Sequence, residues 1–222
     1  LKTIRASVLV PGPLLGRRRR AGVSLPGGCA IGVRPIDQHL KGLARLGAEV
    51  VIENGYVVAR ARRLRGARIT MDLVTVTGTE NLMMAAALAD GTTVIENAAR
   101  EPEVADLAAL LTAMGAKLDG VGTGHIEIQG VPALGGATHR VVADRIEAGT
   151  LVVAGALTRG DVTVTGPVPE PIDAVLAKLD ECGVSLEVGR TSVRVRAPER
   201  PRASDVTTSP FPGFPTDMQA QL

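Results

Sequence analysis

A cysteine that follows a glycine pair is the most reactive side chain the sequence offers. Cys29 comes directly after Pro26, Gly27 and Gly28. Glycines leave a loop without side-chain bulk, so loop closure can carry the thiol over a bound substrate. A lone cysteine is more often a small buried apolar residue, and residue type alone leaves both interpretations open. The second cysteine, Cys182, lies at a predicted helix end and is interpreted as a small buried apolar residue.

Two arginines and one aspartate could complete a site for anionic substrates. Arg5 and Arg34 carry planar, permanently charged forks that fit phosphate or carboxylate groups, although most such arginines are solvated surface charges. Asp217 follows a proline-rich turn where a helix is expected to start. A carboxylate there can be an N-terminal cap or, in a closed cleft, a general base. The basic run at 17–20 is predicted to be a solvated turn.

The composition favours small-molecule partners over macromolecular ones. The chain has 222 residues, of which 25 are basic and 23 acidic, so no global charge would attract nucleic acid or a membrane. One Tyr, two Phe and no Trp make base stacking a poor expectation. The two cysteines lack metal-ligand spacing, and no apolar run reaches the length of a bilayer span. We expect a cytoplasmic protein with no metal, no redox cofactor, no nucleic acid partner and no membrane insertion.

Three glycines reveal an internal repeat that would position these residues. Gly47, Gly115 and Gly183 recur every 68 residues, each at the end of a predicted helix that needs a left-handed residue. After each glycine come two alternating stretches typical of a hairpin. These stretches are 49–52 with 56–59, 117–119 with 125–128, and 185–188 with 192–195.

Each repeat has further elements upstream of its hairpin. Helices are predicted over 81–88 and 151–157, and strands follow over 92–96 and 161–164. Each unit therefore has the order helix, strand, helix, strand, strand, and buries its apolar faces only against neighbouring units. Helical patterns at 1–9 and from Thr216 onward lie at the two ends, so we interpret the chain as a fragment.

Five segments resemble the signatures of the UDP-N-acetylglucosamine enolpyruvyl transferases, which belong to the enolpyruvyl transferase family. The segments are LKTIRAS at 1–7, SLPGGCAIGVRPIDQH at 24–39, ENAAREPE at 96–103, DRIEAGT at 144–150 and FPTDMQAQ at 214–221. Several long motifs in the same order are far more specific than one glycine-rich loop.

This resemblance implies an α/β fold with two domains, each an inside-out α/β barrel of three βαβαββ units, and an active site between them. Residues 1–143 would hold two units of the first domain, incomplete at its N-terminus. Residues 144–222 would hold the first unit of the second domain and the start of the next. The family's N-terminal Lys-Asn pair and the acidic and arginine residues of its last third would lie outside the chain, so these 222 residues alone are expected to be inactive.

The resemblance also implies a reaction. The family transfers the enolpyruvyl group of phosphoenolpyruvate to the 3'-hydroxyl of UDP-N-acetylglucosamine and releases phosphate, the first committed step of peptidoglycan synthesis. Cys29 matches the cysteine that protonates C3 of phosphoenolpyruvate and is the target of fosfomycin. Asp217 matches the aspartate that contacts the attacking hydroxyl and is the candidate base. His39, which follows the motif, is expected to be structural.

Thirteen positions match the family's substrate contacts. They are Arg5, Arg34, Pro35, Ile36, Asp37, Gln38, Leu73, Val74, Thr75, Val76, Glu101, Arg145 and Asp217. The stretch 73–76 matches the uridine-binding strand but departs from the family at Leu73, where lysine is common, so the main-chain contacts are what carries over. Glu101 and Arg145 serve equally well as helix-end charges or as partners in a hinge salt bridge.

Two other functions remain open from the sequence. The sister enzyme 5-enolpyruvylshikimate-3-phosphate synthase shares the fold and the chemistry but lacks the Pro-Gly-Gly-Cys loop. The other alternative is a catalytically dead paralogue that binds a nucleotide sugar and regulates its pathway. Such a copy is free to lose its catalytic residues, so the presence of both Cys29 and Asp217 argues against it. Without the resemblance, the residues indicate a soluble α/β repeat protein with anion sites.

Overall fold

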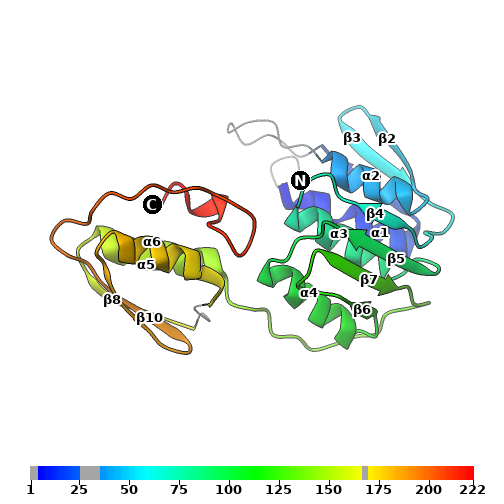
Figure 1. Cartoon of the computed structure of the whole chain (residues 1–222). Coiled ribbons are helices and arrows are strands. Elements are labelled where there is room, and N and C mark those ends of the chain that lie inside the picture. Colours follow the sequence, from blue (N-terminus) through cyan, green and yellow to red (C-terminus); the bar gives the residue numbers. More distant parts are fainter. Residues whose placement is uncertain (1–4, 26–35, 167–169) are drawn as a thin grey trace. The chain divides into compact units, whose positions relative to one another are not determined.

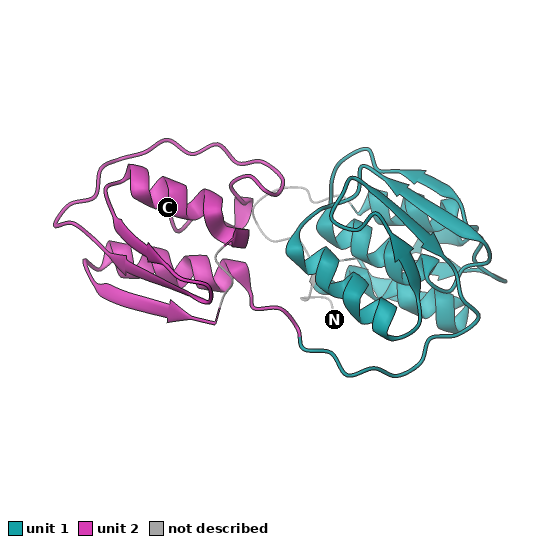
Figure 2. Cartoon of the chain, turned by 60° about the horizontal axis from the view of Figure 1, so that its bottom comes forward, with its two compact units in different colours: residues 1–140 teal, residues 141–222 magenta. Residues whose placement is uncertain are grey.

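The computed structural model describes residues 5–25, 36–166 and 170–222, and it divides the chain into two compact units, Leu1–Arg140 and Val141–Leu222 (Figure 2). Each unit has a hydrophobic core of its own, built mainly from Leu, Ile, Val, Ala and Met side chains. No described helix combines the length and the apolar character needed to cross a membrane. The two units are therefore treated one at a time.

Unit 1 contains the first two repeats, labelled in Figure 1. The first repeat follows a short 3-10 helix, Arg5–Leu9, and consists of α1 (Pro11–Arg18), β1 (Arg20–Ser24), α2 (Asp37–Arg45), β2 (Glu49–Glu53) and β3 (Tyr56–Arg60). The second consists of β4 (Arg68–Thr70), α3 (Val76–Ala86), β5 (Thr92–Glu96), α4 (Pro102–Ala113), β6 (Lys117–Asp119) and β7 (His125–Gln129). Helix α3 is central, because it packs against α1, α2 and α4 and against strands β5 and β7.

Unit 2 contains the third repeat. Its elements are α5 (Arg145–Leu157), β8 (Asp161–Thr165), the 3-10 helix Glu170–Ile172, α6 (Asp173–Glu181), β9 (Ser185–Val188) and β10 (Ser192–Arg196). An extended segment then leads to a last 3-10 helix, η3 (Thr216–Met218). The buried side chains of Phe214 and Met218 anchor this segment in the unit's core.

The three repeats share one antiparallel topology. Within each repeat the last strand lies between the other two, giving the orders β1-β3-β2, β5-β7-β6 and β8-β10-β9. Strand β4 adds to the second of these sheets, parallel to β5. The helix, strand, helix, strand, strand order expected from the sequence is thus present three times.

The repeated glycines end their helices as predicted. Gly47, Gly115 and Gly183 have φ values of 89°, 103° and 83°, which is the left-handed region that glycine occupies without steric cost. After each glycine, the next residue donates its N–H to the carbonyl five residues back, as Ala48 does to Leu43 at 3.0 Å. Such a bond closes the helix end and turns the chain into the following hairpin.

Several expected element boundaries were wrong. Helices α3 and α5 begin at Val76 and Arg145, five or more residues before the positions expected from apolar periodicity. Each start is fixed by a capping side chain: the Thr75 hydroxyl accepts from Gly78 N–H at 3.3 Å, and Asp144 accepts from Ile146 N–H at 2.8 Å. Helix α1 was not expected, and the basic run that was predicted to be a turn ends α1 and begins β1.

Candidate active site

The expected substrate contacts fall in three places. Cys29, Arg34 and Pro35 lie outside the described residues, and Arg5 begins the first 3-10 helix. Ile36, Asp37 and Gln38 form the start of α2, and residues 73–76 lead into α3. Glu101 caps α4 by position, whereas Arg145 and Asp217 belong to unit 2. Within unit 1, Asp72 links the segments 36–38 and 73–76, as the following contacts show.

Gln38 joins the start of α2 to the segment that follows β4. Its side chain is only 6% exposed, and its Oε1 accepts from Asp72 N–H at 2.9 Å. Its Nε2 donates to Asp72 Oδ2 at 3.2 Å and to Asp37 Oδ2 at 3.1 Å. The Gln38 amide is thus hydrogen-bonded within the protein, and its contact with substrate remains a prediction.

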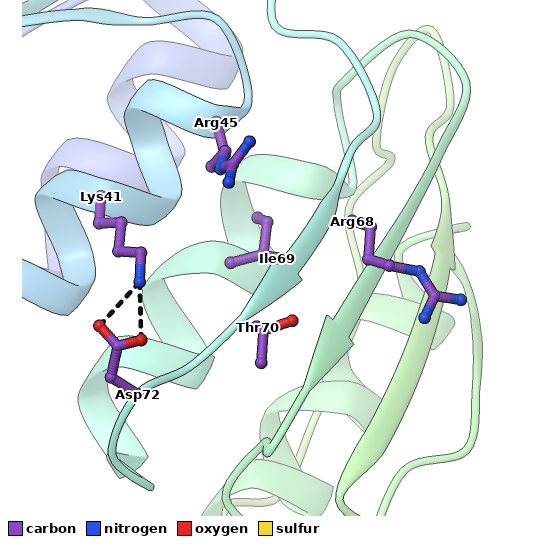
Figure 3. A pocket seen from close by; sticks show the side chains of 6 residues that line it. All are labelled: Lys41, Arg45, Arg68, Ile69, Thr70 and Asp72. Carbon is purple, nitrogen blue, oxygen red and sulfur yellow. Dashed lines mark hydrogen bonds and ion pairs between the residues drawn. The ribbon is translucent and has the colours of Figure 1, made fainter.

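Lys41 and Asp72 extend this connection toward solvent. Lys41 Nζ donates to both carboxylate oxygens of Asp72 at 2.7 Å, as the dashed lines in Figure 3 mark. The pair lines a pocket of about 250 Å³. The pocket is lined by Lys41, Arg45, Arg68, Ile69, Thr70 and Asp72. Two of its three basic side chains already form ion pairs, Lys41 with Asp72 and Arg68 with Glu96.

His39 is structural, as expected. It is 4% exposed, and burial lowers its pKa from 6.5 to about 4, against the opposing charge of Asp37, so the ring is neutral near pH 7. The Asn81 amide nitrogen lies 3.1 Å from Nδ1, and Asn81 Oδ1 accepts from Gly12 N–H at 2.7 Å. Nδ1 is therefore the acceptor and Nε2 carries the hydrogen, 3.4 Å from the Thr77 hydroxyl.

Residues 73–76 do not form the strand that the sequence predicted. Asp72 and Leu73 form a bend, residues 74–75 are irregular, and Val76 is already the first residue of α3. The strand was implied by the family resemblance, but the Thr75 side chain caps α3, and the Thr75 carbonyl accepts from the Thr79 hydroxyl at 2.9 Å. Leu73 is 66% exposed and Val74 37%, so both side chains face solvent at the helix start.

Three carboxylates approach one another between α3 and α4. Glu101 is 7% exposed, and its Oε2 accepts from the Arg100 N–H at 2.9 Å. Burial raises the pKa of Glu80 from 4.5 to about 7, with smaller contributions from Glu103 and Glu101. Sequence reasoning missed Glu80; the signal was a carboxylate inside a helix whose neighbours Asn81, Leu82 and Met83 are all buried. The described residues include no group of three or more His, Cys, Asp or Glu side chains arranged to hold a metal ion.

Asp217 lies on η3 in unit 2. It is exposed and is the second residue of the 3-10 helix, whose N-cap position is Pro215, so Asp217 is not the N-terminal cap that the sequence left open. Its neighbour Met218 is fully buried, with Sδ 3.8 Å from the Thr150 hydroxyl, and Gln221 Nε2 donates to that same hydroxyl at 3.1 Å. The carboxylate therefore projects from a short helix that is anchored against α5.

Arg145, at the start of α5, also reaches this part of unit 2. Its guanidinium lies 5.9 Å from the centre of the Phe211 ring, within cation–π range. This contact joins the first turn of α5 to the segment before η3.

Comparison with known proteins decides the family. The family model of EPSP synthase (3-phosphoshikimate 1-carboxyvinyltransferase) matches residues 1–222, the whole chain. The chain belongs to this family. A UDP-N-acetylglucosamine 1-carboxyvinyltransferase from Acidobacterium capsulatum is 61% identical over 222 residues, which are 100% of this chain and 51% of that protein. The chain thus spans about half the length of this relative, and the family resemblance is confirmed.

Solved structures of the EPSP synthase family share the fold. The enolpyruvyl transferase NikO from Streptomyces tendae matches with a TM-score of 0.80 at 24% identity, over 98% of this chain and 53% of NikO. EPSP synthase from Acinetobacter baumannii matches with a TM-score of 0.60 at 20% identity, over 85% of this chain and 44% of its own. These matches confirm the predicted mixed α/β fold.

Proposed function

We propose that the full-length protein transfers the enolpyruvyl group of phosphoenolpyruvate to the 3'-hydroxyl of UDP-N-acetylglucosamine and releases phosphate, in the cytoplasm, as the first committed step of peptidoglycan synthesis. The observation that carries this proposal is 61% identity to a UDP-N-acetylglucosamine 1-carboxyvinyltransferase along the entire chain. The sugar nucleotide on which that relative acts suggests the acceptor, because the family also includes enzymes that act on shikimate 3-phosphate.

In the proposed reaction Asp217 takes the proton of the sugar 3'-hydroxyl as its oxygen attacks C2 of phosphoenolpyruvate. Cys29 gives a proton to C3, which completes the addition. In the elimination the Cys29 thiolate takes a proton back from C3, the C2–O bond to phosphate breaks, and phosphate leaves as the enol ether forms. General acid and base catalysis by two positioned groups needs no metal or redox cofactor. Arg5 and Arg34 would hold the phosphate and carboxylate of phosphoenolpyruvate.

The nucleotide end of the sugar would lie against unit 1. Residues 36–38 and 73–76 supply main-chain groups and exposed apolar side chains there, and both segments begin helices, whose N-terminal N–H groups favour anions. Binding energy from this remote handle can drive closure and align the reacting atoms. Glu101 and Arg145 would act at the closing interface or on substrate.

The proposal includes the whole architecture of the family. Residues 1–143 would contribute two units to one inside-out α/β barrel, and residues 144–222 would open the second barrel. The three repeats of identical topology support this arrangement, since such units bury their apolar faces against one another.

The test is phosphate release by the full-length protein with phosphoenolpyruvate and either UDP-N-acetylglucosamine or shikimate 3-phosphate. We expect release with the nucleotide sugar alone, and a loss of about 100-fold or more in kcat for Cys29→Ala and for Asp217→Asn. Cys182→Ala, which changes the buried cysteine of unit 2, is the matched control and should keep kcat. Release with shikimate 3-phosphate would assign the sister reaction, and release with neither would favour a binding paralogue.

A further inference from the structure

Asp72 is held from two sides by α2, although 34 residues separate it from Gln38. The buried Gln38 amide makes a reciprocal pair with it, accepting from Asp72 N–H at 2.9 Å and donating to Oδ2 at 3.2 Å. Lys41, one turn further along α2, donates to both carboxylate oxygens at 2.7 Å. We call these three residues the α2 clip.

The α2 clip is stronger than an ordinary surface ion pair. Lys41 and Asp72 are 44% and 59% exposed at their side chains, and an exposed pair of this kind alone contributes little. Gln38 is different because it is buried, and without the Asp72 carboxylate its Nε2 would lose one of its two acceptors and keep only Asp37. The hydrogen bond from Lys41, followed by that from Gln38, lowers the pKa of Asp72, so the carboxylate stays charged throughout the neutral range.

The α2 clip connects the two segments that the proposed function assigns to the nucleotide sugar. On the α2 side it starts at Gln38, within residues 36–38. On the other side Asp72 immediately precedes Leu73 and begins the short bend at 72–73, where Leu73 and the following Val74 are exposed. Thr75 is secured by its capping bonds to α3, so Asp72 is the corresponding attachment at the opposite end of residues 72–75.

We propose that Asp72, held by Gln38 and Lys41, is a positioning residue that sets the separation of segments 36–38 and 73–76 and thereby the affinity for the nucleotide end of the sugar substrate. This inference rests on the proposed function. Asp72 and Lys41 do no chemistry in it, and Gln38 acts through Asp72 with its side chain. Small displacements of supporting groups weaken binding sites, so loss of the α2 clip should affect this substrate selectively.

The experiment compares steady-state kinetics of full-length wild type, Asp72→Ala, Asp72→Asn and Lys41→Met. We expect Asp72→Ala to raise KM for UDP-N-acetylglucosamine about 10-fold, with KM for phosphoenolpyruvate and kcat within about 2-fold of wild type. Asp72→Asn keeps the hydrogen bonds to Gln38 and loses the ion pair with Lys41, so its KM for UDP-N-acetylglucosamine should lie much closer to the wild-type value. Lys41→Met should raise the same KM about 3-fold.

A matched control comes from unit 2. Lys178 and Glu181 form an exposed ion pair with the same 2.7 Å separation and belong to neither segment, so Lys178→Met should change neither KM. Calorimetric titration of each full-length variant with UDP-N-acetylglucosamine alone gives a second measure, which does not depend on turnover. Thermal melting identifies any variant that fails to fold, in which case Lys41→Met, a change at an exposed position, decides the outcome.

The outcomes separate the two proposals. An active wild type whose Asp72→Ala variant keeps its KM for the nucleotide sugar, or loses kcat and both substrates equally, overturns the role of the α2 clip and leaves the proposed function standing. A wild type that neither binds nor uses UDP-N-acetylglucosamine overturns both. A selective rise in KM that Asp72→Asn largely reverses supports the α2 clip.

Discussion

Helices α3 and α5 begin equivalent repeats but have different surroundings. Leu82 and Leu151 lie nine residues before Gly91 and Gly160, the glycines that precede β5 and β8. Leu82 is fully buried, whereas Leu151 is 50% exposed. In unit 1 the α3 face that carries Leu82 is covered by the helices of the preceding repeat, and the part of unit 2 that the structure describes supplies no such cover to α5.

Glycines explain how the preceding repeat comes so close. A side chain at Gly42 of α2 would overlap Leu82, one at Gly16 of α1 would press on Leu88, and one at Gly12 would overlap the Asn81 carbonyl oxygen. The residue equivalent to Leu88 in α5 is Leu157, which is 68% exposed. The difference teaches that one repeat folds its own sheet and helices but completes its apolar face only with a neighbour.

The largest effect should come from truncating the two equivalent leucines. Leu82→Ala creates a cavity in a closed core and should destabilise unit 1 by about 3 kcal/mol, whereas Leu151→Ala should cost unit 2 under about 1 kcal/mol in the 222-residue chain. Hydrogen exchange of the slowest amides reports each unit separately. Equal losses at the two positions would contradict the comparison. In the full-length protein the cost at Leu151 should rise, because a further repeat is expected to cover it.

A second test adds volume where α1 meets α3. Gly12→Ala would force a methyl group onto the Asn81 carbonyl and disturb the bond from Gly12 N–H to Asn81 Oδ1, so we expect about 2 kcal/mol of destabilisation. Gly22→Ala, in strand β1 with open space around the new methyl, is the control and should change stability by less than about 0.5 kcal/mol. Tolerance of Gly12→Ala would show that the two repeats are loosely packed.

Where the repeats are alike, the units should respond alike. Gly115 and Gly183 end equivalent helices at φ values of 103° and 83°, with no atom closer than 3.5 Å to an added methyl group. Alanine at either position should therefore cost about 1 kcal/mol, from the left-handed backbone alone. Gly136→Ala, which has ordinary φ and open surroundings, provides the baseline. Unequal costs would show that the helix ends differ in ways the shared geometry does not capture.

The smallest effect concerns pH. The pKa of Glu80 is raised from 4.5 to about 7, so the folded state favours its protonated form. The contribution of Glu80 to stability is therefore fully present below pH 4.5 and is lost as the pH rises through 7. In unit 2, a hydrogen bond from Arg194 lowers the pKa of Asp161, and one from Lys178 lowers the pKa of Glu181. These carboxylates therefore contribute less to stability as the pH falls. Between pH 5 and pH 8, the unfolding free energy of Glu80→Gln should rise relative to that of wild type by about 1 kcal/mol, after allowance for solvent screening.

The measurement is the difference in unfolding free energy of unit 1 between the variant and wild type at each pH. Taking a difference removes the contribution of His39, whose lowered pKa acts in the opposite direction as pH falls from 6.5 to about 4. A difference that stays constant across this range would place Glu80 in a solvated environment.

The sequence predicted the elements whose signals are local. The glycine ends at 47, 115 and 183 and the hairpins after them follow from turn chemistry and alternation within a few residues. Helix α1 was missed because Pro11, Gly12, Pro13 and Gly16 are poor helix formers, and its packing against α3 comes from a partner about 70 residues away. The start of α3 was missed for the same reason, since Thr77 and Gly78 weaken the periodic signal.

In the candidate site, too, the sequence revealed local features and missed contacts between residues far apart along the chain. A continuous motif identified residues 24–39, whereas nothing near Gln38 in the sequence indicates that Asp72 is its partner. The strand that the resemblance implied at 73–76 is absent because the Thr75 side chain caps α3 at this point. Cys29, Arg34 and the role of Asp217 remain predictions that rest on the resemblance.

Strand β4 has a consequence for the chain in concentrated solution. By pairing with β5 it converts an outer strand of the second sheet into an inner one, whereas the described residues place no strand beside the outer edge of β8. An uncovered edge offers free N–H and C=O groups to strands of other molecules, and Val162 adds apolar surface to it at 37% exposure. Strand β8 is therefore one edge through which the isolated chain can self-associate, and a lysine in place of Val162 would protect that edge.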